Sequence, residues 1–172
     1  MIETTRLWLR PMRWEDVHGL LAIFGDPTVM AAFSSEPFGK PEMARWVERN
    51  LTHQQRHGYG LFSVIHKIDE RIIGDCGLEH RDIRGRAEVE LGYDFCSAYW
   101  NHGFATEAAG AVRDYAFGNL KIDRLASLIR SGNVASRRVA EKIGMQWEAD
   151  FVDNKVAYSL YVAAAMPQTA RT

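Results

Sequence analysis

The spacing of apolar side chains divides the first third of the chain into a strand and two helices. Apolar and polar residues alternate over Thr5–Arg10, which predicts a strand. Apolar residues then recur at helical spacing over Trp14–Phe24, where Asp26-Pro27 should end the helix, and again over Lys40–His57. The segment between these helices, Val29–Gly39, has no clear period, and loops of this length often line a binding site.

The remainder of the chain alternates between predicted strands and two further helices. The strands are Gly60–His66, Arg71–Glu79, Ala87–Phe95, Arg124–Arg130, Met145–Phe151 and Val156–Ala164, with polar turns at 67–70, 82–86 and 153–155. One helix runs from the Gly103 loop to about Asn119, and another covers Val134–Ile143, between Asn133 as N-cap and Gly144 as its stop. The order is β-α-α-β-β-β-α-β-α-β-β, an α/β (α+β) fold. Because a helix joins strands 87–95 and 124–130, they should be parallel in a mixed sheet with helices on both faces.

Length, charge and cysteine usage narrow the class of protein. The chain of 172 residues is expected to form one domain over 1–166, followed by a disordered tail over 167–172. A net charge of −1 gives no field that would attract nucleic acid or an anionic membrane. No apolar run is long enough to span a bilayer, and the first residues lack the pattern of a signal peptide. The two isolated cysteines, Cys76 and Cys96, favour a reducing cytoplasm.

The loop Trp100–Ala105 indicates a binding site for an anion. It contains no aspartate or glutamate and leads directly into the helix that ends near Asn119. The first N–H groups of a helix lack partners and carry the positive end of its dipole, so phosphate is their usual occupant. Gly103 permits positive φ and a close approach of the backbone to the anion, and Ala105 keeps the next turn shallow.

Three separated motifs carry a resemblance to a known family. They are Thr5–Pro11 followed by Asp16 and Asp26-Pro27, then Glu90–Tyr93 with Tyr99–Ala108, and finally Asn133–Gly144. In this order and spacing they resemble the GNAT N-acetyltransferases, in the branch like the ribosomal-protein alanine N-acetyltransferases. The superfamily's loop pattern begins with Gln or Arg. This chain has Trp100 there, as is common in that branch, so no side-chain amide or guanidinium at that position assists the backbone amides.

The resemblance implies an acetyl-CoA site on a mostly antiparallel sheet of about seven strands that splays in the middle. The loop residues at the cofactor would be Trp100, Asn101, His102, Gly103, Phe104, Ala105 and Thr106. Their N–H groups, from about position 102 onward, would hold the pyrophosphate. The pantetheine arm would pair with the backbone of Asp94, Phe95 and Cys96 like an added strand. Asn133 would hydrogen-bond that arm, and Arg138, slightly favoured over its neighbour Arg137, would reach the phosphates near adenosine. No metal is implied.

Transfer to an amine requires a neutral amine, and a lysine-like ammonium has a pKa of about 10.4. The strand that would deliver the thioester carries Glu90, which we take as the general base, acting directly or through water. The alternative is that Glu90 pairs with an arginine, and Glu88 and Glu79 are further carboxylates nearby. Ser136 would assist the departing thiolate, unless it only helps to cap its helix, and Tyr158 is the other hydroxyl that might serve.

Other reactive side chains have simpler interpretations. Cys96 lacks the His and Asp or Asn partners of a nucleophile, so its backbone is the part expected to matter. His53 and His57 stand at helical spacing, but no third metal ligand accompanies them, which favours surface histidines. The side chain of His102 is expected to point to solvent. Phe33–Phe38 is the favoured aromatic segment for an acceptor groove, because it lies on the irregular loop between two helices.

The sequence therefore predicts an acetyl-CoA-dependent N-acetyltransferase that acts on a primary amine. The branch implies the N-terminal α-amine of a protein, ribosomal proteins included, while many relatives act on small amines. The alternative is a non-catalytic module that binds acetyl-CoA. A P-loop nucleotide enzyme is excluded, because the Gly-rich Walker motif ending in Gly-Lys-Ser/Thr does not occur. A homodimer is suggested only by analogy.

Overall fold

The computed structural model describes residues 1–165; the predicted tail, 167–172, lies outside the described residues. The strands are β1 (Ile2–Glu3), β2 (Leu7–Pro11), β3 (Leu61–His66), β4 (Arg71–Ile83), β5 (Arg86–Phe95), β6 (Arg124–Arg130), β7 (Gln146–Asp153) and β8 (Val156–Ala164). The α-helices are α1 (Val17–Phe24), α2 (Pro27–Ala31), α3 (Lys40–His57), α4 (Phe104–Gly118) and α5 (Val134–Lys142). Short 3-10 turns cover Trp14–Asp16 and Ser97–Tyr99.

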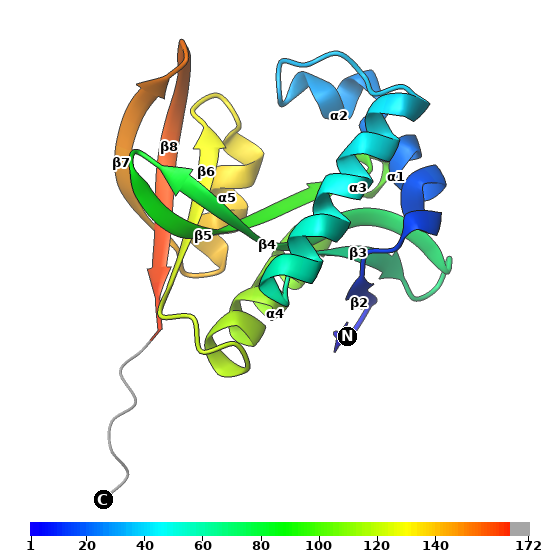
Figure 1. Cartoon of the computed structure of the whole chain (residues 1–172), viewed down its shortest axis with the longest axis horizontal. Coiled ribbons are helices and arrows are strands. Elements are labelled where there is room, and N and C mark those ends of the chain that lie inside the picture. Colours follow the sequence, from blue (N-terminus) through cyan, green and yellow to red (C-terminus); the bar gives the residue numbers. More distant parts are fainter. Residues whose placement is uncertain (166–172) are drawn as a thin grey trace, which may run out of the picture.

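One mixed sheet joins the strands in the order β1-β2-β3-β4-β5-β6-β8-β7 (Figure 1). Neighbouring strands are antiparallel except β5 and β6, which are parallel and connected through α4. The mostly antiparallel sheet and the parallel pair are thereby confirmed, and the predicted element order holds except for the additional β1 and α2. The sheet contains eight strands rather than about seven, because the short β1 pairs with Trp8 and Leu9 of the chain's first predicted strand.

Helices cover both faces of the sheet, and each face has its own apolar core. On one face, α4 and α5 bury residues such as Val112 against strand residues such as Leu91. On the other face, α1, α2 and α3 enclose a second core around Leu20. The cores are separate because successive residues of a strand point to opposite faces, so that Ile73 faces the first core and Ile72 the second.

The segment around α1 and α2 differs from the sequence prediction. The predicted helix from Trp14 begins as a 3-10 turn and becomes α-helical only at Val17. The first helix ends before Asp26, as predicted, but Asp26 also starts a further helix. Its side chain accepts a hydrogen bond from the Thr28 N–H at 2.8 Å and caps α2, whose first residue is Pro27.

The β4–β5 hairpin is longer than the apolar pattern predicts. Its turn contracts from the predicted 82–86 to Arg84 and Gly85, both with positive φ, because β4 continues to Ile83. The last hairpin turns in the same way at Asn154 and Lys155, within the predicted turn. Two-residue turns with positive φ match the twist of antiparallel strands, and Gly85 and Asn154 are residue types that favour this conformation.

The sheet opens between β5 and β6. These strands share a single register pair, Glu90 with Ala126, whereas β4 and β5 are paired continuously from Gly74 and Phe95 to the hairpin turn. Toward Phe95, the edge of β5 that faces β6 therefore has no strand beside it. This is the splay that the family resemblance implies.

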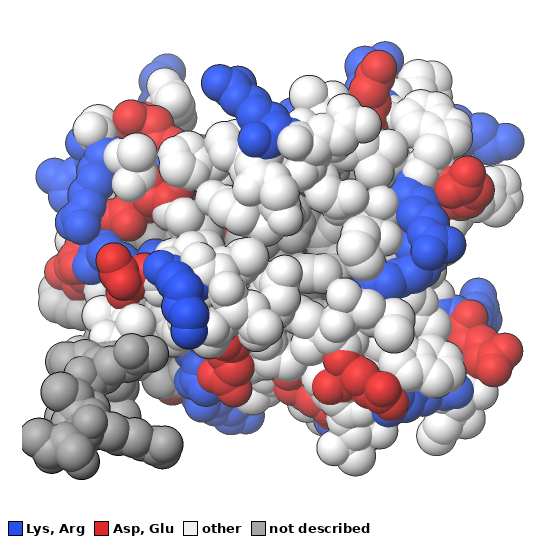
Figure 2. Space-filling model, turned by 60° about the horizontal axis from the view of Figure 1, so that its bottom comes forward, with Lys and Arg blue, Asp and Glu red and all other residues white. Residues whose placement is uncertain are grey.

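The surface charges are mixed in sign. Figure 2 shows lysine and arginine side chains interspersed with aspartate and glutamate around the rim of one face, while the middle of that face carries few charged side chains. This mixture agrees with the net charge of −1. Among residues 1–165, no helix combines the length and the apolar character needed to cross a membrane.

Candidate functional site

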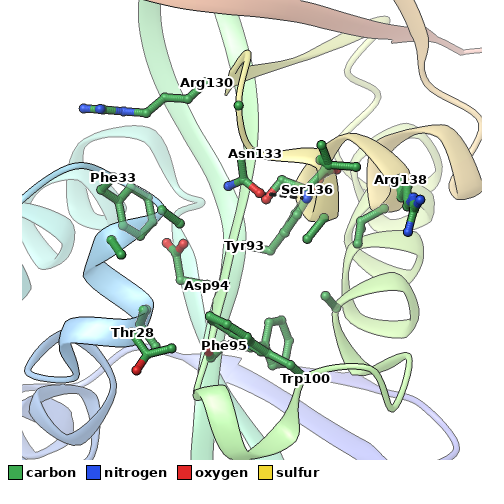
Figure 3. Close-up of a pocket in the computed structure, with 18 of the residues that line it drawn as sticks. Thr28, Phe33, Tyr93, Asp94, Phe95, Trp100, Arg130, Asn133, Ser136 and Arg138 are labelled. Atoms are coloured by element: carbon green, nitrogen blue, oxygen red, sulfur yellow. Dashed lines mark hydrogen bonds between the residues drawn. The ribbon is translucent and has the colours of Figure 1, made fainter.

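Two clefts meet where β5 and β6 diverge. The larger has a volume of about 1170 Å³ and extends from the N-terminus of α4 to α5. The smaller, of about 350 Å³, lies over β4 and β5. The residues that line both are Ala32, Phe33, Tyr93, Asp94, Arg130, Asn133 and Ser136 (Figure 3). Ligands in the two clefts would therefore meet beside Asp94 and Ser136.

The larger cleft ends at the N-terminus of α4. Gly103 precedes the helix with a φ of 81°, which confirms the predicted positive φ, and Asn101 has a φ of 64°. The N–H groups of residues 103–106 donate to no acceptor within the described residues, whereas that of Glu107 bonds the Gly103 carbonyl at 3.0 Å. Free donors at the positive end of a helix dipole are the features for which the sequence predicts an anion site here.

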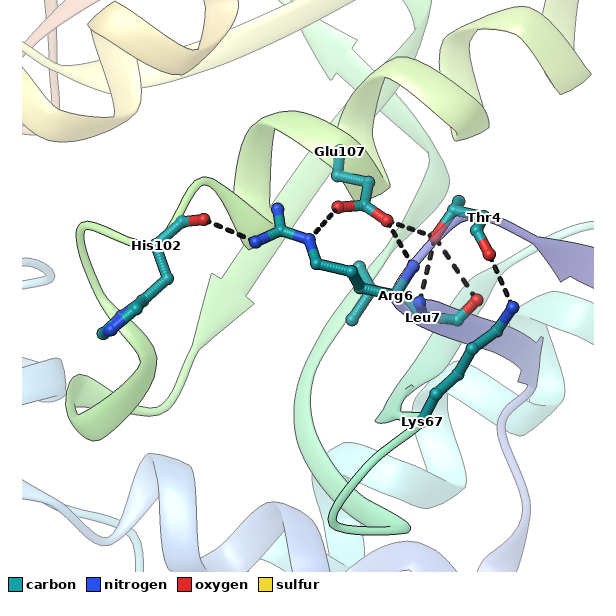
Figure 4. A network of polar contacts seen from close by, with 6 residues as sticks. All are labelled: Thr4, Arg6, Leu7, Lys67, His102 and Glu107. Atoms are coloured by element: carbon teal, nitrogen blue, oxygen red, sulfur yellow. Dashed lines mark hydrogen bonds and ion pairs between the residues drawn. The ribbon is translucent and has the colours of Figure 1, made fainter.

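The turn between β1 and β2 holds this loop in place (Figure 4). Arg6 donates from Nε to Glu107 at 2.7 Å and from Nη1 to the His102 carbonyl at 2.9 Å, and its guanidinium lies 4.3 Å from the ring centre of Phe104. Glu107 also accepts from the Thr4 hydroxyl at 2.6 Å and from the Arg6 N–H at 2.9 Å. Burial acts against ionisation, but these hydrogen bonds and the arginine charge lower the pKa of Glu107. The charged pair thus fixes the loop against β2.

The last residues of β5 form one wall of the larger cleft. Asp94 and Phe95 line it, and the Phe95 carbonyl accepts a hydrogen bond from the indole of Trp100 at 2.8 Å. Cys96 lines neither cleft, and its N–H already donates to the Ile73 carbonyl at 2.8 Å. We therefore keep Asp94 and Phe95 as predicted partners of an extended ligand and leave Cys96 out.

The opposite wall is the first turn of α5. Asn133 accepts a hydrogen bond from the Ser136 N–H at 3.1 Å, which confirms the predicted N-cap, and the Ser136 carbonyl accepts from the Tyr93 hydroxyl at 2.7 Å (Figure 3). Burial raises the pKa of Tyr93 far above its usual value, so its hydroxyl stays a neutral donor. The Ser136 hydroxyl itself makes no hydrogen bond within residues 1–165 and is available to a ligand.

Basic side chains border the far part of the larger cleft. Arg138 lines it together with Lys142 and Lys155. Arg137 does not line the cleft, and its guanidinium donates to the Ser131 carbonyl at 3.4 Å. This placement favours Arg138 over Arg137 for a phosphate contact, as the sequence slightly does.

The smaller cleft is dominated by carboxylates of β4 and β5. Its acidic residues are Asp75, Glu79, Glu90 and Asp94, and its basic residues are Arg81 and Arg130. Glu90 is 7% exposed, and its carboxylate is paired with Arg81 at 2.6 Å. An ion pair with an arginine is the alternative to a general base that the sequence leaves open. Burial, followed by the charge of Glu90, raises the pKa of Glu79. The surplus of carboxylates suits a cationic ligand such as an ammonium group.

A hydroxyl and an aromatic ring complete the junction of the clefts. Tyr158 lines only the smaller cleft, whereas Ser136 lines both, so Ser136 is better placed beside a thioester sulfur. Phe33 lines both clefts, in agreement with its predicted place in a groove. Phe38, at the other end of the predicted segment, instead stacks on Phe24 in the second core, with ring centroids 5.7 Å apart.

The remaining predicted side chains lie outside both clefts. The exposed ring of His102 contacts the Trp100 carbonyl at 2.7 Å, and His102 lines neither cleft. His53 stacks on His57 at 4.5 Å, and its Nε2 accepts from the His80 N–H at 2.8 Å. The part of the chain that the structure describes contains no group of His, Cys, Asp and Glu able to hold a metal ion.

Sequence reasoning missed site residues whose contacts cross long stretches of chain. Thr4, Arg6 and Tyr93 act on segments about 40 to 100 residues away, and no local pattern indicates such contacts. Asp75 is different, because alternate positions 75, 77 and 79 of a predicted strand hold Asp, Gly and Glu. Polar and small residues on one face of a strand are a signal for a cleft that could have been used.

Comparisons with known proteins agree with this geometry. Residues 6–146 match the family model described as "Acetyltransferase (GNAT) domain". The chain is 37% identical over 145 residues to YkkB of Bacillus subtilis, with 84% of each protein covered. It is 33% identical over 147 residues to the "Uncharacterized N-acetyltransferase p20" of Bacillus licheniformis, with 84% of this chain and 82% of the relative covered.

Solved structures share the fold. A GNAT-family acetyltransferase from Bacillus anthracis superposes with a TM-score of 0.82 at 25% identity, covering 95% of this chain and 98% of that one. A spermidine N-acetyltransferase from Vibrio cholerae, solved with CoA and spermine, gives a TM-score of 0.75 at 17% identity, covering 94% and 97%, and shows the fold alone. Since the family model covers residues 6–146, which is the greater part of the chain, and the relatives match over most of their length, this chain belongs to the GNAT family of acetyltransferases.

Proposed function

We propose that the protein transfers an acetyl group directly from acetyl-CoA to a primary amine. The acceptor would be the N-terminal α-amine of a protein, ribosomal proteins included, or a small-molecule amine. The observation that carries this proposal is the meeting of two unlike clefts, one with free N–H donors for an anion and one with carboxylates for a cation. Both clefts open on Asp94 and Ser136, where a thioester and an amine would come together.

Acetyl-CoA would occupy the larger cleft. Its diphosphate would bind the N–H groups of residues 103–106, and Arg138 would contact the phosphates near adenosine. The pantetheine arm would run along Asp94 and Phe95, where β5 lacks a neighbouring strand, with Asn133 on its other side. The volume of about 1170 Å³ exceeds the roughly 300–1,000 Å³ of ordinary small-molecule sites, which supports a ligand as large as CoA.

The amine would enter through the smaller cleft as an ammonium ion. It must lose a proton before its nitrogen attacks the thioester carbonyl, and a carboxylate of β5 would take this proton. The sequence predicts Glu90 for this step. The Ser136 hydroxyl would donate a hydrogen bond to the departing thiolate, with Tyr158 as the alternative donor. The proposed setting is the cytoplasm, and a homodimer is proposed only by analogy.

A screen of acceptors tests this function. Release of CoA thiol from acetyl-CoA is measured with spermidine, an aminoglycoside, and peptides that carry the N-terminal sequences of ribosomal proteins, and each product is weighed for one added acetyl group. The proposal predicts amine-dependent release and an acetylated product. Calorimetric binding of CoA without release for any amine would instead favour the non-catalytic acetyl-CoA-binding module.

A further inference from the structure

A row of polar side chains crosses the sheet on the face covered by α1 and α3. The strand register places Arg10 beside Ser63, Ser63 beside Asp75, and Asp75 beside Asp94. The side chains at the beginning of this row have polar partners. Ser63 donates a hydrogen bond to Asp16 at 2.6 Å, and Asp16 is paired with Arg10 at 2.6 Å. The row ends in the smaller cleft with two adjacent carboxyl groups, Asp75 and Asp94.

Asp75 is a fully buried carboxyl group without a partner. Its exposed fraction is 0%, and neither of its side-chain oxygens has a hydrogen-bond partner within residues 1–165. An ionised carboxylate in such a place is very unfavourable, so Asp75 holds a proton. Burial, followed by the charge of Asp94, raises the pKa of Asp75 well above its usual value.

Asp94 is the accessible member of this pair. It lines both clefts, and Figure 3 shows its carboxylate directed toward the side of Phe33 and away from Tyr93. Among the described residues, no hydrogen bond contributes to the pKa of Asp94. Burial, together with the charges of Glu79 and Glu90, raises the pKa of Asp94 to about 7. A carboxylate of this kind is partly ionised at neutral pH and binds a proton readily.

The charged groups around Asp94 leave room for an ammonium ion. Those that face it across the smaller cleft are Glu79 and Arg81 of β4, Glu90 of β5, Arg130 of β6 and Tyr158 of β8. From the helix layer, Arg49 of α3 acts on Glu79, and the lining residues Phe33 and Trp46 are uncharged. Gly92 lies between Glu90 and Asp94 on the same face of β5, and a Cβ built there would meet nothing within 4 Å.

We infer that Asp94, backed by the neutral carboxyl group of Asp75, removes the proton from the acceptor amine. This inference rests on the proposed acetyl transfer and assigns its base to Asp94 rather than to Glu90. Glu90, held by Arg81 at 2.6 Å, contributes negative charge that attracts the ammonium ion. Asp94 is the catalytic residue here, and Asp75 is its neutral neighbour in the strand register.

The steps balance in protons and electrons. The ammonium group gives one proton to the Asp94 carboxylate, and the freed nitrogen lone pair forms a bond to the carbonyl carbon of the thioester. The carbon–sulfur bond breaks, and its electron pair stays on sulfur. The second nitrogen proton neutralises the thiolate to give CoA thiol, and Asp94 returns its proton to solvent. The products are an acetylated amine, CoA thiol and one released proton.

Four variants separate the roles of these carboxylates. Asp94→Asn, Asp75→Asn and Glu90→Gln each replace a carboxyl group by an amide of the same shape, and Asp114→Asn does so at an exposed position of α4. For each variant, kcat is measured against pH with spermidine, or with an alanine-initiated peptide if that gives faster thiol release. CoA affinity, measured by calorimetry, shows whether the fold is retained.

The wild type should show a rise of kcat with pH through about 7. Asp94→Asn should lose this rise and at least about 100-fold in kcat, a typical contribution of a general base, with CoA affinity retained. Asp75→Asn should keep the rise, because it replaces a neutral group by another neutral group. Asp114→Asn should also keep it, and Glu90→Gln should keep it at a lower pH, because the charge of Glu90 helps to raise the pKa of Asp94. Asp94→Glu, which retains a carboxylate, should recover part of the rate.

A second measurement does not depend on the acceptor. Protein labelled with carbon-13 at the aspartate carboxyl groups is titrated by NMR, and one carboxyl signal should titrate near pH 7 in the wild type and be absent in Asp94→Asn. A wild-type rise of kcat that persists in Asp94→Asn, or that disappears in Glu90→Gln, would overturn the inference. Absence of amine-dependent thiol release in the wild type would instead overturn the proposed acetyl transfer.

Discussion

The larger and the smaller cleft recognise their ligands by different means. The larger presents backbone groups, namely the free N–H donors of residues 103–106 and the unpaired edge of β5. The smaller presents carboxyl side chains, Asp75 and Glu79 from β4 and Glu90 and Asp94 from β5. Backbone recognition needs only local geometry, such as a glycine with positive φ at a helix N-terminus. Side-chain recognition depends on strand register, and each residue can change independently, so the smaller cleft is where acceptor choice would reside.

The largest expected effect is at Gly103, where a substitution should disturb backbone recognition in the larger cleft and leave the side chains of the smaller cleft in place. Gly103→Val forces a β-branched residue into a φ of 81° and reshapes the anion site. We expect CoA affinity to fall by about 100-fold, which is about 2.7 kcal/mol. Calorimetry with CoA measures this loss.

Gly85→Val is the matched control for Gly103→Val. Gly85 has a φ of 77°, lies in the β4–β5 turn and lines neither cleft. Both variants should lose a similar free energy of unfolding, on the order of 1–2 kcal/mol, but only Gly103→Val should lose affinity. Equal CoA affinities in the two variants would contradict the anion site at α4.

A smaller effect is expected at Ser136, which lines both clefts. Ser136→Ala should lower kcat by about 10-fold, at or below the weak end of acid catalysis, because a thiolate is a fair leaving group without help. CoA affinity should change little. Tyr158→Phe serves as the comparison, since Tyr158 lines only the smaller cleft. A larger loss of kcat in Tyr158→Phe than in Ser136→Ala would move the thiolate contact to Tyr158.

The carboxyl pair of Asp75 and Asp94 should also make the free energy of unfolding depend on pH. The pKa of Asp94 is higher in the folded chain than its ordinary value, so the folded state binds the proton more tightly, and the free energy of unfolding falls as pH rises from 3.8 to about 7. Asp94→Asn removes this penalty. The variant should therefore gain stability over the wild type across this window, on the order of 1 kcal/mol because the cleft admits water. Urea unfolding at several pH values measures it, and a difference that does not vary with pH would count against a raised pKa.

The smallest expected effect concerns the basic residues of α5. Arg138→Ala should weaken CoA binding by about 3-fold, as for an exposed ion pair, and added salt should reduce the difference. Arg137→Ala is the control, because Arg137 does not line the larger cleft. The prediction fails if Arg137→Ala weakens binding as much as Arg138→Ala does.

Much of the larger cleft could be predicted from the sequence, because the signals for its residues are local. Gly103 before an amphipathic helix, and Asn133 and Gly144 around the next one, specify helix ends without reference to the rest of the chain. The three motifs then supplied the family resemblance. The short α2 escaped prediction because five residues are too few to show a helical period.

The smaller cleft could not be predicted in the same way. The adjacency of Asp75 and Asp94 follows from the register of β4 and β5, which a single strand pattern does not specify. Their raised pKa values depend on burial in the folded chain and on the carboxylates that the same register brings near them. The sequence offers Glu90 as a carboxylate on the right strand, but its ion pair with Arg81 becomes visible only in the folded hairpin.

The central claim is that the two clefts hold a thioester and an amine at the same time, so that the acetyl group passes directly between them. Initial rates measured while acetyl-CoA and the best amine of the screen are both varied test this claim most directly. The account predicts reciprocal plots that intersect, the pattern of a ternary complex. Parallel lines, together with acetyl label retained on the protein before the amine is added, would show a covalent intermediate and would contradict it.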